Sequence, residues 1–226
     1  FMIHPFRNEA DALPYVAGWL RVLASERLTP EASMVQAQVL LDQMTQQQGL
    51  RRIFSNPLLL RLAVAAYLET GEPIHNRAEI YRRYVDEVLW QRSQRYNVAC
   101  FTKAQVQQAL VCVAWILQSQ PQTPVQHIVE RLNTSRDVEF DSDAMLVFLQ
   151  QGLGLLGAYD YANGTLLAFR HLTFQEFLVG RLLAKLWTTE RQTTWRLLQA
   201  QLHVPAWRES IMLMAGLLEQ SAATEF

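Results

Sequence analysis

The sequence has few of the residues that interrupt helices or crosslink a fold. It contains nine glycines, eight prolines and only two cysteines, Cys100 and Cys112, among 226 residues. Two cysteines in apolar stretches cannot form a disulfide framework, so we expect both to be reduced core residues, as is usual in the cytoplasm. The longest apolar candidate, residues 109–117, is about half of the roughly 18 residues needed to cross a bilayer. We therefore expect no membrane segment.

The charge of the chain also lacks any excess of one sign. Twenty lysines and arginines nearly balance 21 acidic residues, which leaves a formal net charge of -1. A balanced chain has no global attraction to nucleic acid or to an anionic membrane. The first residues show no basic region followed by an apolar stretch, so we expect no signal peptide and a cytoplasmic location. Half of the residues are hydrophobic, enough for one large domain or two small ones.

Apolar residues recur three and four positions apart over most of the chain, which is the period of an amphipathic α-helix. The predicted helices cover residues 9–26, 30–48, 58–70, a segment from 77, 103 to near 121, 124–132, 142 to about 151, and a segment after 173. Two further helices are expected after Thr193, near Trp195 and Trp207, and the tryptophan and leucine stripes of this tail are expected to be core. Gly71 is expected to close the helix 58–70, because glycine readily adopts the left-handed conformation of a helix end.

Several helix starts carry the spacing of a capping box, in which a short polar side chain and a residue three positions later cap each other's amides. The predicted pairs are Asn76 with Glu79, Thr102 with Gln105, and Thr173 with Glu176. Asp141 is expected to cap the helix that follows it.

One segment predicts β structure. Two short apolar or aromatic runs, Leu155–Tyr161 and Thr165–Phe169, flank Asn163-Gly164, and Asn-Gly between such runs is the strongest short hairpin signal. Three helices followed by a two-stranded wing is the order of a winged-helix domain, here over about Arg77 to Arg170. The expected fold is mainly α: a helical bundle, then a winged-helix domain with one β-hairpin, then further amphipathic helices.

Three segments in this order resemble the region that follows the ATPase core in NACHT-family signal-transduction ATPases of the STAND class. The segments are Asn56-Pro57-Leu58-Leu59-Leu60, with Tyr67 and Gly71 behind it, Arg77-Ala78-Glu79-Ile80-Tyr81-Arg82-Arg83-Tyr84-Val85, and Phe169-Arg170-His171-Leu172-Thr173-Phe174-Gln175-Glu176-Phe177-Leu178. The resemblance covers nearly the whole chain. It implies a first helical domain over residues 1–71, a winged-helix domain over 72–170, and the start of a second helical domain over 171–226.

The resemblance implies a nucleotide-dependent switch in which ADP is clamped between the ATPase core, the first helical domain and the winged helix. Pro57 matches the proline that packs on adenine in the family, and His171 matches the histidine that approaches the terminal phosphate of ADP. ADP or ATP would be bound by the intact protein, with Mg²⁺ held by the core. The implied partners are the protein's own ATPase core and sensor domain, with a homo-oligomer on activation.

The chain departs from the family in one large respect, because it has no Gly-x-x-x-x-Gly-Lys-Ser/Thr phosphate loop. Gly152, Gly154 and Gly157 lie close together, but no Lys-Ser or Lys-Thr follows them. A phosphate loop needs backbone amides around the phosphates and a lysine that reaches them. We therefore expect no catalytic residues and no ATPase activity in this stretch, although the intact protein would be an ATPase.

The residues themselves allow a simpler interpretation of both sites. His171 precedes a predicted helix start, where amides and the helix dipole attract anions, but it could equally end a strand and satisfy a local carbonyl. Pro57 suits the first turn of a helix whether or not it contacts a base. Glu176 is expected to be a cap and Phe177 a core residue. The remaining histidines, His4, His75, His127 and His203, have no metal-ligand spacing, so no metal site is expected.

Two other classes of function remain as alternatives. A winged helix that binds DNA should present basic or amide side chains on the helix before the wing. That helix, from Asp141 to Gln150, is acidic and then apolar, so we expect no nucleic-acid partner. A helical scaffold that only binds proteins is the second alternative, and only the ordered match of the three segments speaks against it.

Overall fold

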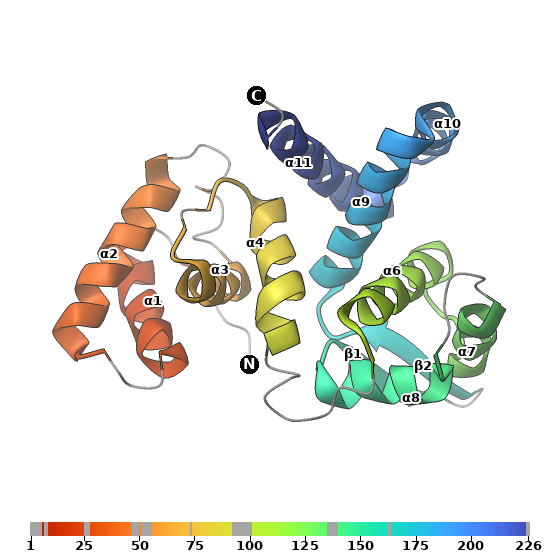
Figure 1. The fold of residues 1–226 in the computed structure, drawn as a ribbon, viewed down its shortest axis with the longest axis horizontal. Helices are drawn as coiled ribbons and strands as arrows, with labels where there is room; N and C mark the ends of the chain where they lie inside the picture. The colour runs from red at the N-terminus through yellow and green to blue at the C-terminus, as the bar shows by residue number, and fades with distance from the viewer. Residues whose placement is uncertain are drawn as a thin grey trace. The chain divides into compact units, whose positions relative to one another are not determined.

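The computed structural model describes residues 6, 9–24, 28–46, 50, 56–72, 74–91, 101–134, 140–161 and 164–224. These residues are mainly helical and include one two-stranded antiparallel sheet (Figure 1). The predicted mainly-α fold class is confirmed at this level. The chain divides into two compact units, Phe1–Val88 and Leu89–Phe226, which are called the first and second unit below.

The first unit is built from helices that pack in chain order. They are α1 (Glu9–Leu23), α2 (Pro30–Gln46), α3 (Pro57–Thr70), α4 (Arg77–Arg83) and the π-helical turn η2 (Tyr84–Val88). Helix α1 packs against α2 and α3, and α3 packs against α4 and η2. The predicted ends of the first two helices, residues 26 and 48, lie outside the described residues.

Helix α3 begins one residue before the predicted Leu58 and ends at the predicted Thr70, because local interactions fix both ends. The Asn56 side chain accepts a hydrogen bond from the amide of Leu59 at 3.2 Å, and Pro57 occupies the first turn. Gly71 adopts a left-handed conformation with φ of 67°, and its N–H donates to the Tyr67 carbonyl at 2.7 Å. Glycine adopts this conformation without the Cβ clash that other residues meet there.

Helix α4 is capped by Asn76, whose side chain accepts from the Glu79 amide at 2.9 Å. The carboxylate of Glu79 accepts from the amide of His75 at 2.7 Å, one residue before the amide expected for a capping box. Glu79 also forms a buried ion pair with Arg83, whose guanidinium donates to the hydroxyl of Thr70 at 2.7 Å. Arg83 therefore connects α4 to the end of α3.

This connection places Arg77–Val88 with the first compact unit. The resemblance instead puts a domain boundary after Gly71. The two compact units are defined by packing, whereas the three domains are implied by the resemblance. The division into three domains therefore remains a prediction. Helix α4 and the turn η2 pack on α3.

From residue 101 the described part of the second unit begins with helices and the hairpin. They are α6 (Lys103–Ser119), α7 (Val125–Thr134), α8 (Ser142–Val147) with its π-helical continuation η3 (Phe148–Gly152), β1 (Leu156–Tyr161) and β2 (Gly164–Phe169). The capping box at the start of α6 is confirmed, since Thr102 and Gln105 each accept from the other's amide. Asp141 caps α8 by accepting from the Ala144 amide at 3.0 Å.

The predicted hairpin is also confirmed. Leu156 pairs with Phe169 at its base and Tyr161 with Gly164 at its tip, although Asn163 itself lies outside the described residues. Pro124, at the start of α7, forms an isolated antiparallel bridge with Leu166. The hairpin therefore lies against the helices that precede it in the chain.

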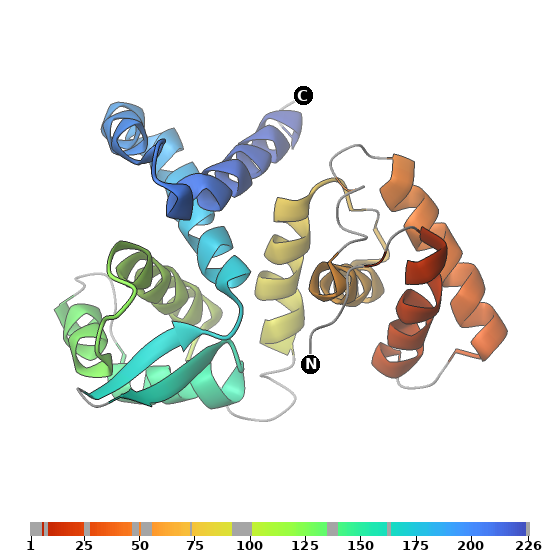
Figure 2. The ribbon, with the colours of Figure 1, turned by 180° about the vertical axis from the view of Figure 1, so that it is seen from behind.

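Helix α9 (Leu172–Thr189) leads from the hairpin into a helical array with α10 (Arg191–Gln201), the 3-10 turn η4 (Pro205–Trp207) and α11 (Arg208–Thr224) (Figure 2). Helices α9 and α11 pack closely at Gly180. A Cβ added there would lie 2.7 Å from the Ser210 carbonyl oxygen. Only glycine allows the two backbones this approach.

Candidate functional site

His171 lies at the junction between the hairpin and α9. It is the N-cap residue of that 18-residue helix, with extended backbone angles, and its carbonyl accepts from the amide of Phe174 at 3.1 Å. Its side chain makes no capping hydrogen bond and is exposed. The imidazole lies 6.3 Å from the buried Phe174 ring, measured between centroids.

The prediction that Thr173 caps this helix is wrong. The helix begins at Leu172, so Thr173 is its second residue, and its hydroxyl is buried with no hydrogen-bond partner among the described residues. Strand pairing explains the early start. The amide of Arg170 donates to the Leu155 carbonyl at 2.9 Å, and its Nε donates to the Leu156 carbonyl at 3.1 Å. The chain is thus held in the hairpin up to residue 170 and turns into the helix at once.

The start of α9 has the properties of an anion site. The first amides of a helix have no partner within the helix, and the helix dipole adds partial positive charge there. His171 adds an exposed imidazole beside these amides, and the exposed Arg170 precedes it in the chain. A phosphate oxygen at this place could accept hydrogen bonds from the imidazole and the amides together.

Pro57 has the structural role expected of a proline after an N-cap. It is half-buried in the first turn of α3, and its carbonyl accepts a hydrogen bond from the Tyr15 hydroxyl at 3.0 Å. Tyr15 also contacts Trp19 with ring centroids 6.2 Å apart, and the Arg61 guanidinium lies 4.4 Å from the centroid of the Trp19 ring. Pro57 thus starts α3 beside aromatic side chains of α1.

Pro57 belongs to the first compact unit and His171 to the second. Both positions were singled out by the resemblance of their segments, and the structure places each at a helix start.

Two conspicuous residues of the third segment are structural. Gln175 is buried and donates from Nε2 to the Oε1 of Gln118 on α6 at 3.0 Å, while Gln118 donates to the Ala206 carbonyl at 2.9 Å. Phe177 is fully buried, as predicted. Glu176 is the fifth residue of α9, too far along to cap it. The two glutamines therefore connect α6, α9 and η4, a role that the sequence pattern did not indicate.

Replacing Gln175 by leucine is expected to lower the free energy of unfolding by about 1–3 kcal/mol, because the buried Oε1 of Gln118 loses its donor. Urea denaturation followed by circular dichroism measures the change. Gln199→Leu is the matched control on the exposed surface of α10, where an effect within about 0.5 kcal/mol is expected. Equal losses in both variants would contradict the role given to the buried pair.

The described residues contain no group of three His, Cys, Asp or Glu side chains placed to hold a metal ion. They also include no helix long and apolar enough to span a bilayer. Cys112 is a free, partly buried thiol, and burial raises its pKa more than the nearby Arg131 lowers it. A raised pKa disfavours the nucleophilic thiolate. Cys100 lies outside the described residues.

Sequence reasoning missed one exposed cluster. Trp187 at the end of α9 and Arg191, Gln192 and Trp195 at the start of α10 line a surface hollow. The spacing of Arg191 and Trp195 places them on one helical face, but the sequence interpretation assigned the tryptophans of the tail to the core. Trp195 is 46% exposed, whereas Trp207 is buried.

Comparisons of the chain with protein-family models, with curated proteins and with solved structures found no match.

Proposed function

We propose that this chain is the regulatory, nucleotide-sensing portion of a NACHT-type signalling ATPase. In this proposal residues 72–170, which include α4, α6, α7, α8 and the hairpin, form a winged-helix domain, and α9 starts a second helical domain. The chain itself supplies no catalytic group. It holds the ADP-bound closed state and contributes contacts to the rest of the protein or to an oligomer.

The observation that carries the proposal is the position of His171. Its imidazole is exposed, makes no capping bond, and stands at the first amides of an 18-residue helix. A histidine that satisfied a local carbonyl, the simpler interpretation of this residue, would have a hydrogen-bond partner in its own turn. Among the described residues no such bond involves the His171 side chain. The ring contact with Phe174 limits the directions in which the imidazole can point.

A bound ADP would supply the terminal phosphate that His171 and the first amides of α9 can recognise. Pro57 gives weaker support to the same proposal, because its place in the first turn of α3 already accounts for a proline at this position. The half-buried face around it carries the Tyr15 ring and the Arg61–Trp19 pair. An apolar ring beside aromatic groups is suited to packing on a flat base.

The structure of α8 argues against a DNA-binding winged helix. Asp141 and Asp143 are exposed at its start, and the exposed Val147 stands near its end. The hairpin presents Tyr159 and Asp160. Phosphate repulsion at such a surface opposes DNA binding, which normally requires lysine or arginine near the backbone.

Replacing His171 by leucine is expected to weaken ADP retention and to raise basal activity, because the closed state loses a contact that the open state does not make. The loss of one hydrogen bond to a charged group predicts roughly tenfold to hundredfold weaker ADP binding. The measurement is the rate at which prebound ADP leaves a longer protein that carries this chain and an ATPase core.

His203→Leu is the control, since His203 is also exposed but lies in the turn after α10. Its ADP release rate is expected to be unchanged. If His171→Leu released ADP no faster than His203→Leu and left basal signalling unchanged, the proposed role of His171 would be wrong.

A further inference from the structure

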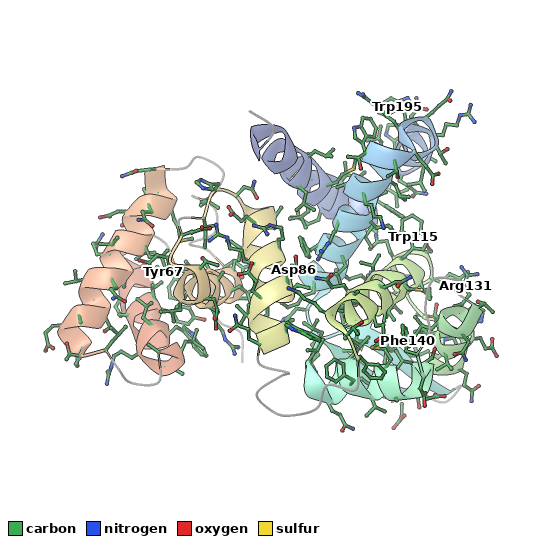
Figure 3. The ribbon with its side chains drawn as sticks, in the orientation of Figure 1. Tyr67, Asp86, Trp115, Arg131, Phe140 and Trp195 are labelled. Carbon is green, nitrogen blue, oxygen red and sulfur yellow. The ribbon has the colours of Figure 1, made fainter. Side chains whose placement is uncertain are left out.

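The corner between α9 and α10 carries a hollow of about 470 Å³ whose lining is aromatic and cationic. Its lining residues are Trp187, Arg191, Gln192 and Trp195. The indole rings of Trp187 and Trp195 meet edge to face, with centroids 6.3 Å apart. Trp195 projects from α10 and keeps 46% of its surface exposed (Figure 3). Trp187 is half-buried and Trp195 exposed, so the pair leaves aromatic surface open to a partner.

Arg191 is positioned to bind an anion. Its guanidinium lies 4.9 Å from the centroid of the Trp187 ring, and stacking on a ring holds the planar group while leaving its N–H edges directed outward. Among the described residues no carboxylate forms an ion pair with Arg191. A stacked guanidinium without a carboxylate partner is suited to bidentate recognition of an incoming one.

The apolar part of this surface extends along α10. Leu202 lies seven residues after Trp195, two helical turns along nearly the same face, and it is 53% exposed. Thr194 and Leu198 form the neighbouring buried face. Arg191, Trp195 and Leu202 thus form one exposed stripe, with a cation at one end and apolar groups after it.

The charges around the hollow are also one-sided. From residue 177 to residue 208 the sequence has a single acidic residue, Glu190, in a chain whose overall net charge is -1. The basic residues in the same stretch are Arg181, Lys185, Arg191, Arg196 and Arg208. Four of them, all but Arg181, are exposed. The end of α9 and the start of α10 thus carry Lys185, Arg191 and Arg196 against Glu190, a positive excess that attracts an acidic partner.

We propose that the hollow formed by Trp187, Arg191, Gln192 and Trp195 binds an acidic peptide segment of a partner protein that carries an aromatic side chain. The aromatic side chain packs against the exposed face of Trp195, and a neighbouring carboxylate pairs with the guanidinium of Arg191. Gln192 offers an amide to the peptide backbone. Tryptophan and arginine are the residues most enriched where binding energy concentrates at interfaces.

The test is fluorescence anisotropy with the 226-residue chain and a fluorescein-labelled peptide of repeating Asp-Phe-Glu-Pro. We expect binding that weakens as salt is raised. Matched peptides with lysine in place of the acidic residues, or alanine in place of phenylalanine, are expected to bind at least about tenfold more weakly, since each loses one of the two recognised groups.

Two substitutions at the hollow distinguish binding there from a general attraction to the positive charge of the surrounding surface. Trp195→Ala and Arg191→Gln are each expected to weaken peptide binding by about tenfold or more. Arg196→Gln changes the net charge as much as Arg191→Gln does, but Arg196 does not line the hollow, so its effect is expected to be smaller. Met212→Ala, an equally exposed apolar change on α11, is expected to leave binding unchanged. Circular dichroism checks that each variant is folded.

Three results would overturn the proposal. The first is an equal loss of peptide binding in Arg191→Gln and Arg196→Gln. The second is tighter binding of labelled oligo(dT) than of the acidic peptide, which would make the surface a single-stranded nucleic-acid site, where bases stack on tryptophan. The third is concentration-dependent self-association of the chain in sedimentation that Trp195→Ala abolishes, which would make the occupant a second copy.

Discussion

Replacing Arg83 by methionine is expected to lower the free energy of unfolding of the first unit by about 3–5 kcal/mol. The side chains of Arg83 and Glu79 are each only 4% exposed and form a hydrogen-bonded ion pair, with Nε donating to the Glu79 Oε1 at 3.0 Å. Methionine fills much of the volume but leaves the Glu79 carboxylate buried without its hydrogen-bonded cation, with only the exposed Arg82 guanidinium at 3.8 Å. The Thr70 hydroxyl and the Glu72 carbonyl lose a donor as well.

The neighbouring Arg82 supplies the control for this prediction. It lies 3.8 Å from the same Glu79 carboxylate, but its side chain is 40% exposed, and ion pairs of that kind contribute about 0–1 kcal/mol. Arg82→Met is therefore expected to change the stability little. Urea denaturation followed by circular dichroism gives the free energies, and hydrogen exchange of the α3 and α4 amides locates the loss.

A double variant distinguishes a buried-charge penalty from lost packing. Arg83→Met combined with Glu79→Gln removes the uncompensated carboxylate, so it is expected to be more stable than Arg83→Met alone. If the double variant were less stable than the single one by the full cost of Glu79→Gln, the two side chains would not be coupled. The ion pair would then not be what holds α4 to the end of α3.

Replacing Gly180 by alanine is expected to destabilise the second unit by about 1–3 kcal/mol, since overpacking a close contact costs about that much. The added Cβ would lie 2.7 Å from the Ser210 carbonyl oxygen and 3.0 Å from the Met214 amide nitrogen. Both atoms belong to the α11 backbone, which cannot move aside as a side-chain end can. The two helices would have to separate, and α11 makes its largest contact with α9.

The same substitution at Gly18 is the control, with the opposite sign expected. Gly18 lies inside α1, is exposed, and an added Cβ would meet nothing within 4 Å. Alanine should stabilise that helix by roughly 0.5–1 kcal/mol, because it loses less backbone freedom on folding than glycine. Thermal unfolding of the two variants checks both signs. A loss of stability in Gly18→Ala comparable to that in Gly180→Ala would show that the contact with α11 is not the cause.

The sequence by itself determined the helix ends that depend on neighbouring residues. Asn56, Pro57 and Gly71 delimit α3, and Thr102 with Gln105 starts α6, because each of these signals acts on amides or carbonyls within four residues. The hairpin was predictable for the same reason, since the turn and the alternating runs lie in one short segment. The proposed contact residues, Pro57 and His171, came from the resemblance of the sequence segments, and each stands at such a local boundary.

The start of α9 shows where local signals stop being sufficient. The capping pattern at Thr173 is present in the sequence, but hydrogen bonds from Arg170 to Leu155 and Leu156 carry the chain straight from strand to helix. Those partners lie on the other strand, so no window of sequence around Thr173 contains them. The π-helical turns η2 and η3 continue predicted helices. The spacing of apolar residues does not distinguish their hydrogen-bond pattern from that of an α-helix.

Only the tertiary structure decided which polar and small residues are buried against another helix, and which large ones are left outside. Arg83 and Gln175 are buried because α3 and α6 supply their partners, and Gly180 is required because α11 crosses there. Trp195 is exposed although its spacing suits a core position. The helical period predicts which residues share a face of a helix. Whether that face is buried depends on the element that packs against it, and that element is distant in sequence.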